Sequence, residues 1–95
     1  MSKPTDNDTV EQLATKIKQD LMELHGVLLH GNALYRALGF ETGNAFRQAK
    51  LKGHIPVPLM NFENKRGSYA LTEDVALWLA EQRLSVKDER GETNM

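Results

Sequence analysis

Residues that end helices divide this chain into short segments. Gly26, Gly39 and Gly53 each follow a stretch with helical spacing of apolar residues, and glycine is a common helix-ending residue. Pro56 and Pro58 then exclude a helix from the segment that follows Gly53. The chain is therefore restricted to several short helices and one extended region, and it has no internal repeat.

The two ends of the chain are polar. Residues 1–9 and 85–95 are predicted to be flexible tails around one domain at residues 10–84. Apolar residues recur every three or four positions from Val10 to Leu24, which predicts an amphipathic helix over residues 10–25. The apolar stripe of this helix either packs within the domain or forms the interface of a homodimer.

The middle of the chain predicts two short helices followed by a β-hairpin. The first helix ends before Gly39, and the second covers residues 43–52 with Glu41 or Thr42 as its cap. The segment 58–71 fits a β-hairpin whose tip is the polar stretch NKRG.

The flanking segments complete the predicted fold. Residues 27–30 (VLLH) are either a strand or an extended lead-in, and a last helix begins at Thr72 and places Trp78 in the core. The predicted fold class is mainly α with a small β-hairpin: a winged helix-turn-helix domain with an extra N-terminal helix.

Basic residues are concentrated in the middle of the chain. The net charge of the whole chain is −1. Residues 31–71 carry six Lys or Arg against two Glu, a net charge of +4, whereas the segments on both sides are acidic. A basic block of this kind is typical of a surface that faces a polyanion.

The second short helix carries the side chains suited to reading DNA. Asn44, Arg47 and Gln48 are three and four residues apart and share one helix face, while Ala45 and Ala49 are predicted to face inward. Asn and Gln pair with adenine and Arg pairs with guanine in the major groove. The start of the helix and the hairpin tip add phosphate contacts. The predicted DNA-contacting residues are Thr42, Gly43, Asn44, Arg47, Gln48, Lys50, Lys52, Lys65 and Arg66.

Several motifs follow one another in a fixed order over residues 29–82. They are Leu38-Gly39, a polar turn, Phe46-Arg47, a basic patch, Gly53-His54-Ile55-Pro56, a basic tip at Lys65-Arg66, and Glu73-Asp74 ahead of Leu77-Trp78-Leu79. This combination resembles the AlpA-like and excisionase group of winged helix-turn-helix DNA-binding proteins, which are distant relatives of the MerR superfamily. The resemblance implies double-stranded DNA as the partner and a role in a phage-like or mobile element.

Other classes of protein find little support. The chain has no cysteine, and His25, His30 and His54 do not share a helix face, so no metal site is expected. Without a glycine-rich phosphate loop or a nucleophile motif, we expect neither enzyme activity nor a cofactor. No apolar run reaches the length of a membrane span and no secretory signal is recognised, so we expect a cytoplasmic protein without a membrane partner.

These observations support a transcriptional regulator or excision factor that binds double-stranded DNA, with its second short helix in the major groove and its hairpin on the backbone. The alternative is a protein-interaction adaptor whose basic face docks an acidic partner such as a polymerase, a repressor or a recombinase. The pI of about 6.3 favours this alternative more than a basic pI would. A homodimer through Val10 to Leu24 is compatible with both functions.

Overall fold

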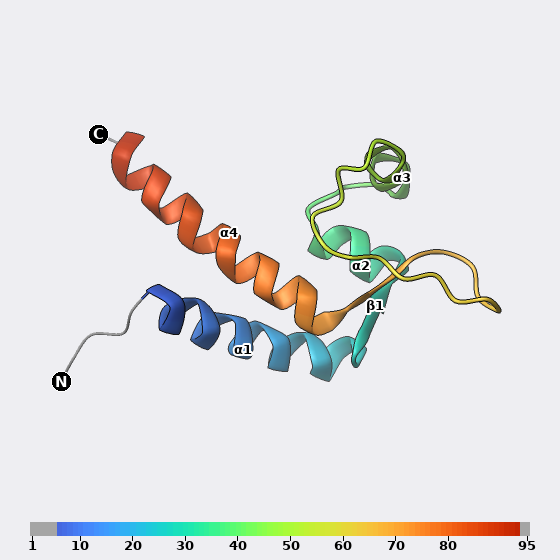
Figure 1. Cartoon of the computed structure of the whole chain (residues 1–95), viewed down its shortest axis with the longest axis horizontal. Helices are drawn as coiled ribbons and strands as arrows, with labels where there is room; N and C mark the ends of the chain where they lie inside the picture. The colour runs from blue at the N-terminus through green and yellow to red at the C-terminus, as the bar shows by residue number, and fades with distance from the viewer. Residues whose placement is uncertain (1–5, 94–95) are drawn as a thin grey trace.

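The protein is mainly helical with one small sheet (Figure 1). A computed structural model describes residues 6–93, with side chains described for residues 10–85. None of the helices in this part of the chain is long and apolar enough to cross a membrane. The elements are α1 (Asp6–His25), β1 (Leu28–His30), α2 (Gly31–Ala37), α3 (Gly43–Leu51), β2 (Tyr69–Leu71) and α4 (Thr72–Thr93).

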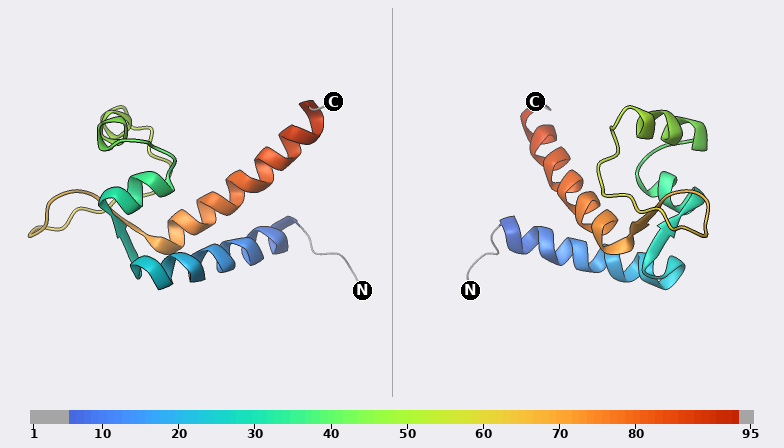
Figure 2. Two further views of the ribbon diagram at one scale, coloured as in Figure 1. Left: turned by 180° about the vertical axis from the view of Figure 1, so that it is seen from behind. Right: turned by 45° about the vertical axis from the view of Figure 1, so that its right-hand side comes forward.

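The two-stranded sheet joins the first and last helices. β1 and β2 are antiparallel, with Leu29 opposite Ala70. Because α1 leads into β1 and β2 leads into α4, this pairing places α1 and α4 side by side with opposite chain directions (Figures 1 and 2). The fully buried Thr72 reinforces the junction, since its hydroxyl donates to the Gly26 carbonyl at 2.6 Å and its backbone N–H donates to the Val27 carbonyl at 2.9 Å.

The hydrophobic core lies around the sheet, α2 and the first turns of α4. Leu21 of α1 packs against this core, as do Trp78 and Leu79 of α4. The predicted core position of Trp78 is therefore confirmed, although its ring is only partly buried. Part of the apolar stripe of α1 is likewise used within the domain. The buried core residues are Leu29, Leu34, Leu38, Val57, Ala70 and Val75.

Both short helices end at the predicted glycines. At the end of α3, the N–H of Gly53 donates to the Lys50 carbonyl at 3.1 Å, and the N–H of His54 donates to the Ala49 carbonyl at 2.8 Å. This pair of bonds is a Schellman motif, and the φ of Gly53 is +74°, in the left-handed region that glycine adopts without strain. α2 ends in the same way at Gly39, with a φ of +93°.

The terminal helices are longer than the sequence predicted. α1 begins before Val10 and α4 continues past Leu84, so residues 6–9 and 85–93 are helical rather than parts of the tails. Apolar periodicity marks where a helix packs, whereas a helix that has formed extends at little cost into adjoining polar residues. The rest of the predicted tails, residues 1–5 and 94–95, lies outside the described residues.

The segment 58–71 does not form the predicted regular hairpin. Its two sides meet at a single bridge between Met60 and Tyr69, whose backbone hydrogen bonds measure 2.7 and 2.9 Å. The main partner of β2 is β1, which confirms the strand interpretation of the VLLH stretch. Pro58 cannot donate to a ladder, so the proline-free β1 is the better partner. Residues 61–68 form a loop that extends away from the helices (Figure 2).

Candidate nucleic-acid interface

Aromatic packing fixes α3 against α2. The ring of Phe46 stacks with that of Tyr35 at 6.4 Å between centroids and meets the ring of Phe40 edge-on at 5.8 Å. Phe46 and Ala49 are half-buried on this side of α3. The opposite side of α3 is left open to solvent.

The side chains predicted to read DNA lie on the open side of α3. Asn44, Arg47 and Gln48 are all exposed, as expected from their spacing. Ala45 is exposed too, so the prediction that it faces inward is wrong. The reason is that Phe46 supplies the contacts with α2, which leaves Ala45 outside the packed side.

The start of α3 is capped by Thr42. Its hydroxyl oxygen accepts a hydrogen bond from the N–H of Ala45 at 3.0 Å, and its backbone is extended, with φ −136° and ψ 158°. Of the two predicted caps, Glu41 and Thr42, the structure uses Thr42. Because the hydroxyl acts as an acceptor in this bond, its own hydrogen stays available to donate to an anion.

A hollow of about 230 Å³ lies between α2, α3 and the residues just before β2. Two cationic side chains, Arg47 and Lys50, line it, and the amine of Lys50 donates to the hydroxyl of the buried Ser68 at 2.7 Å. A concave surface with two cations is chemically suited to a phosphate group. The lining residues are Gly31, Tyr35, Gly43, Phe46, Arg47, Lys50, Gly67 and Ser68.

Three of the predicted cations, Lys52, Lys65 and Arg66, do not line this hollow. Lys52 is exposed at the end of α3, and Lys65 and Arg66 are exposed on the 61–68 loop. The last two residues of the loop, Gly67 and Ser68, do line the hollow, so the base of the loop adjoins α3. Inside the loop, the ring of Phe62 packs edge-on against Tyr69 at 5.0 Å, as expected for an aromatic pair used in packing.

Five residues that line the hollow were not among the predicted contacts: Gly31, Tyr35, Phe46, Gly67 and Ser68. Ser68 is 18 positions from Lys50, and no local pattern signals a contact over that separation. Gly31 and Tyr35 belong to α2, whose apolar face alone was recognised.

Comparison with protein-family models, curated proteins and solved structures finds no match for this chain. Its function therefore has to be inferred from these residues.

Proposed function

We propose that the protein binds double-stranded DNA as a winged helix-turn-helix protein of the AlpA-like and excisionase type. In this arrangement α2 and α3 are the two helices of the motif, and α3 enters the major groove, which is about 12 Å wide and admits one helix. The 61–68 loop acts as a short wing that contacts the DNA backbone. The role is that of a transcriptional regulator or an excision factor of a phage-like or mobile element.

The observation that carries the proposal is the combination of two surfaces on α3. Its open side presents Asn44, Arg47 and Gln48, and its edge supplies Arg47 and Lys50 to the adjoining hollow. Phosphate contacts position a protein on DNA and base contacts supply sequence specificity, so a helix that carries both kinds of group is suited to reading DNA. The +4 charge of residues 31–71 supports the same polyanionic partner.

The proposed roles differ between the side chains. Arg47 pairs with guanine, while Asn44 and Gln48 pair with adenine, and each such contact is worth about 1–3 kcal/mol of base discrimination. Thr42 and Gly43 bring the start of α3 to a phosphate. The cations that contact phosphates are Lys50, Lys52, Lys65 and Arg66.

The test is fluorescence-anisotropy binding to a random-sequence duplex over a salt series. Wild-type protein is expected to bind with an affinity that falls steeply as salt rises, because bound phosphates release counterions. Arg47→Ala is expected to weaken binding. Arg83→Ala, an exposed arginine of α4 outside the proposed surface, removes the same charge and is expected to bind like the wild type.

Two outcomes would contradict the proposal. Equal weakening by Arg47→Ala and Arg83→Ala would mean that total charge, not α3, governs binding. Absence of binding by the wild type at low salt would favour the adaptor alternative, which the pI of about 6.3 favours more than a basic pI would. An acidic protein such as a recombinase or polymerase would then be the partner to seek by pull-down.

A further inference from the structure

A continuous groove runs between α1 and α4 on a part of the molecule separate from α3. One section of about 280 Å³ is lined by Glu11, Ala14, Thr15, Lys18, Glu73 and Leu77. A second section of about 160 Å³ is lined by Lys18, Met22, Val27, Leu71, Thr72 and Glu73. Because Lys18 and Glu73 line both sections, they mark the middle of one groove.

The groove leaves apolar side chains exposed at both of its ends. Leu77 is 42% exposed at one end, and at the other end Met22 is 37%, Val27 58% and Leu71 41% exposed. None of the α1 side chains from residue 10 to residue 25 is fully buried. An amphipathic helix with a half-exposed apolar side is typical of an interaction surface.

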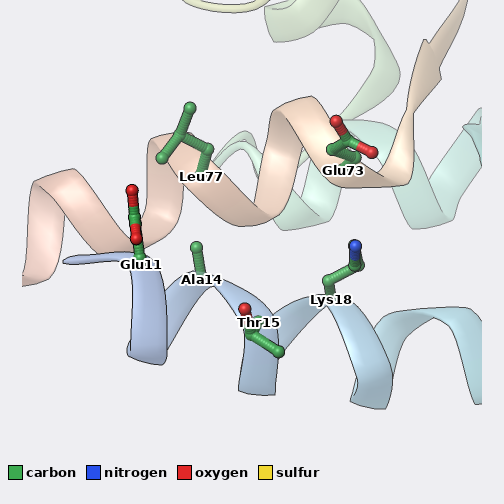
Figure 3. Close-up of a pocket in the computed structure, with 6 residues that line it drawn as sticks. All are labelled: Glu11, Ala14, Thr15, Lys18, Glu73 and Leu77. Carbon is green, nitrogen blue, oxygen red and sulfur yellow. The ribbon is translucent and has the colours of Figure 1, made fainter. Parts of the chain in front are cut away.

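Charge is arranged across the groove, not along it. Figure 3 shows Lys18 on α1 opposite Glu73 on α4, and Ala14 opposite Leu77 one section further along. The centre of the groove therefore carries one positive and one negative side chain, on opposite walls. A uniformly acidic or uniformly basic partner would meet one like charge there.

We propose that the occupant of this groove is a second copy of the chain, related by a two-fold axis that lies along the groove, between the Lys18 wall and the Glu73 wall. Rotation by 180° about this axis exchanges the two walls of the groove. Lys18 then lies over the partner's Glu73, and Glu73 lies over the partner's Lys18. The contact is self-complementary in charge, as the isologous interface of a symmetric dimer requires.

The same rotation places each apolar end of the groove against the same end in the partner. The end with Met22, Val27 and Leu71 meets the same end of the partner, and the end with Ala14 and Leu77 likewise meets its own copy, so each exposed apolar group gains an apolar neighbour. The protomer is less compact than a typical domain of its length, with a radius of gyration of 15.1 Å against about 12 Å. A partner in the groove would therefore bury apolar surface that the protomer leaves exposed. A second copy in the groove would pack on α1 and on the first turns of α4.

The test is the mass of the full chain in solution without DNA, which makes the outcome independent of the proposed function. Wild-type protein is expected to reach twice the monomer mass of 10.7 kDa in a concentration series extending to about 1 mM. Lys18→Glu places Glu on both walls, and Glu73→Lys places Lys on both walls. Each variant alone is expected to stay monomeric, because its two copies repel each other.

The mass of a mixture of the two variants is the decisive measurement. Equal amounts of Lys18→Glu and Glu73→Lys are expected to form a heterodimer, since Glu on both walls of one copy meets Lys on both walls of the other. Unfolding of either variant cannot produce this result. The matched controls, Lys16→Glu on α1 and Glu81→Lys on α4, change the same charges at exposed positions outside the groove and are expected to dimerise.

Three results would overturn the proposal: a wild-type protein that is monomeric over the whole series, a mixture of the two variants that stays monomeric, or an assembly that grows beyond two copies. A monomeric wild type would leave a different protein as the partner of the groove.

Discussion

The amine of Lys50 donates a hydrogen bond to the hydroxyl of Ser68 at 2.7 Å. Lys50 is exposed on α3, whereas Ser68 is buried at the end of the 61–68 loop. The bond therefore ties α3 to the base of the loop. Since a hydroxyl is neutral, the lysine keeps its full charge towards any anion in the adjoining hollow.

Ser68→Ala is expected to weaken DNA binding a few-fold without changing its salt dependence, because the variant misplaces the Lys50 amine but removes no charge. Lys50→Ala is expected to reduce the slope of log affinity against log salt by about 0.9, the value for one lost phosphate contact. Ser85→Ala on the exposed side of α4 serves as the control and should match the wild type. Anisotropy titrations over a salt series measure both quantities. Equal changes of slope in Ser68→Ala and Lys50→Ala would contradict the positioning role of Ser68.

Thr72→Val is expected to destabilise the fold. The Thr72 hydroxyl donates to the Gly26 carbonyl at 2.6 Å, and valine of nearly the same shape would leave that carbonyl without this donor. Because Gly26 is exposed, water can reach its carbonyl, and the expected cost is the net contribution of one hydrogen bond, about 0.5–1.5 kcal/mol. Urea unfolding followed by circular dichroism measures this cost.

Thr72→Ser is the companion variant, because it keeps the hydroxyl and loses only a methyl group. Its cost is expected to be about 0.8 kcal/mol, the transfer free energy of one buried carbon. If Thr72→Val were as stable as the wild type, the bond to Gly26 would contribute nothing to the junction of β1 and α4.

The glycines at the two ends of α3, Gly43 at its start and Gly53 just after it, are expected to respond to alanine with opposite signs. Gly43 has no left-handed φ, and an added Cβ would lie 3.5 Å from Cε2 of Tyr35, which is ordinary contact. Gly43→Ala should therefore stabilise the fold by about 0.4–1 kcal/mol. Gly53→Ala should destabilise it by about 1–2 kcal/mol, because the φ of +74° strains any residue with a Cβ. Thermal unfolding of both variants tests the pair, and changes of the same sign would contradict it.

The parts of the fold that depend on local sequence were predictable. The stops at Gly39 and Gly53 are set by residues within one helical turn, and the open side of α3 follows from the spacing of Asn44, Arg47 and Gln48. Thr42 as a cap is equally local. These features require no knowledge of what packs against them.

The parts that depend on distant residues were not predictable. β2 pairs with β1 across about 40 residues of chain, and no residue near Tyr69 in the sequence points to so distant a partner. The Lys50–Ser68 bond has the same origin. The polar extension of α4 beyond Leu84 has no apolar periodicity to mark it.

Thr42→Asp is expected to separate stability from DNA binding. Aspartate is as good a helix cap as threonine and its charge is favourable at a helix start, so the free energy of unfolding should stay equal or rise by a few tenths of a kcal/mol. The same charge would repel a phosphate near the start of α3, so DNA affinity should fall at least several-fold. Thr42→Ala should instead lose about 1 kcal/mol of stability with the bond to Ala45.

Ser85→Asp adds the same negative charge at an exposed position of α4 and isolates the effect of location from that of net charge. Thermal unfolding and anisotropy on the same preparations measure the two effects. Suppose that Thr42→Asp bound DNA no more weakly than Ser85→Asp. The start of α3 would then lie away from the DNA backbone, and α3 would not enter the major groove in the proposed orientation.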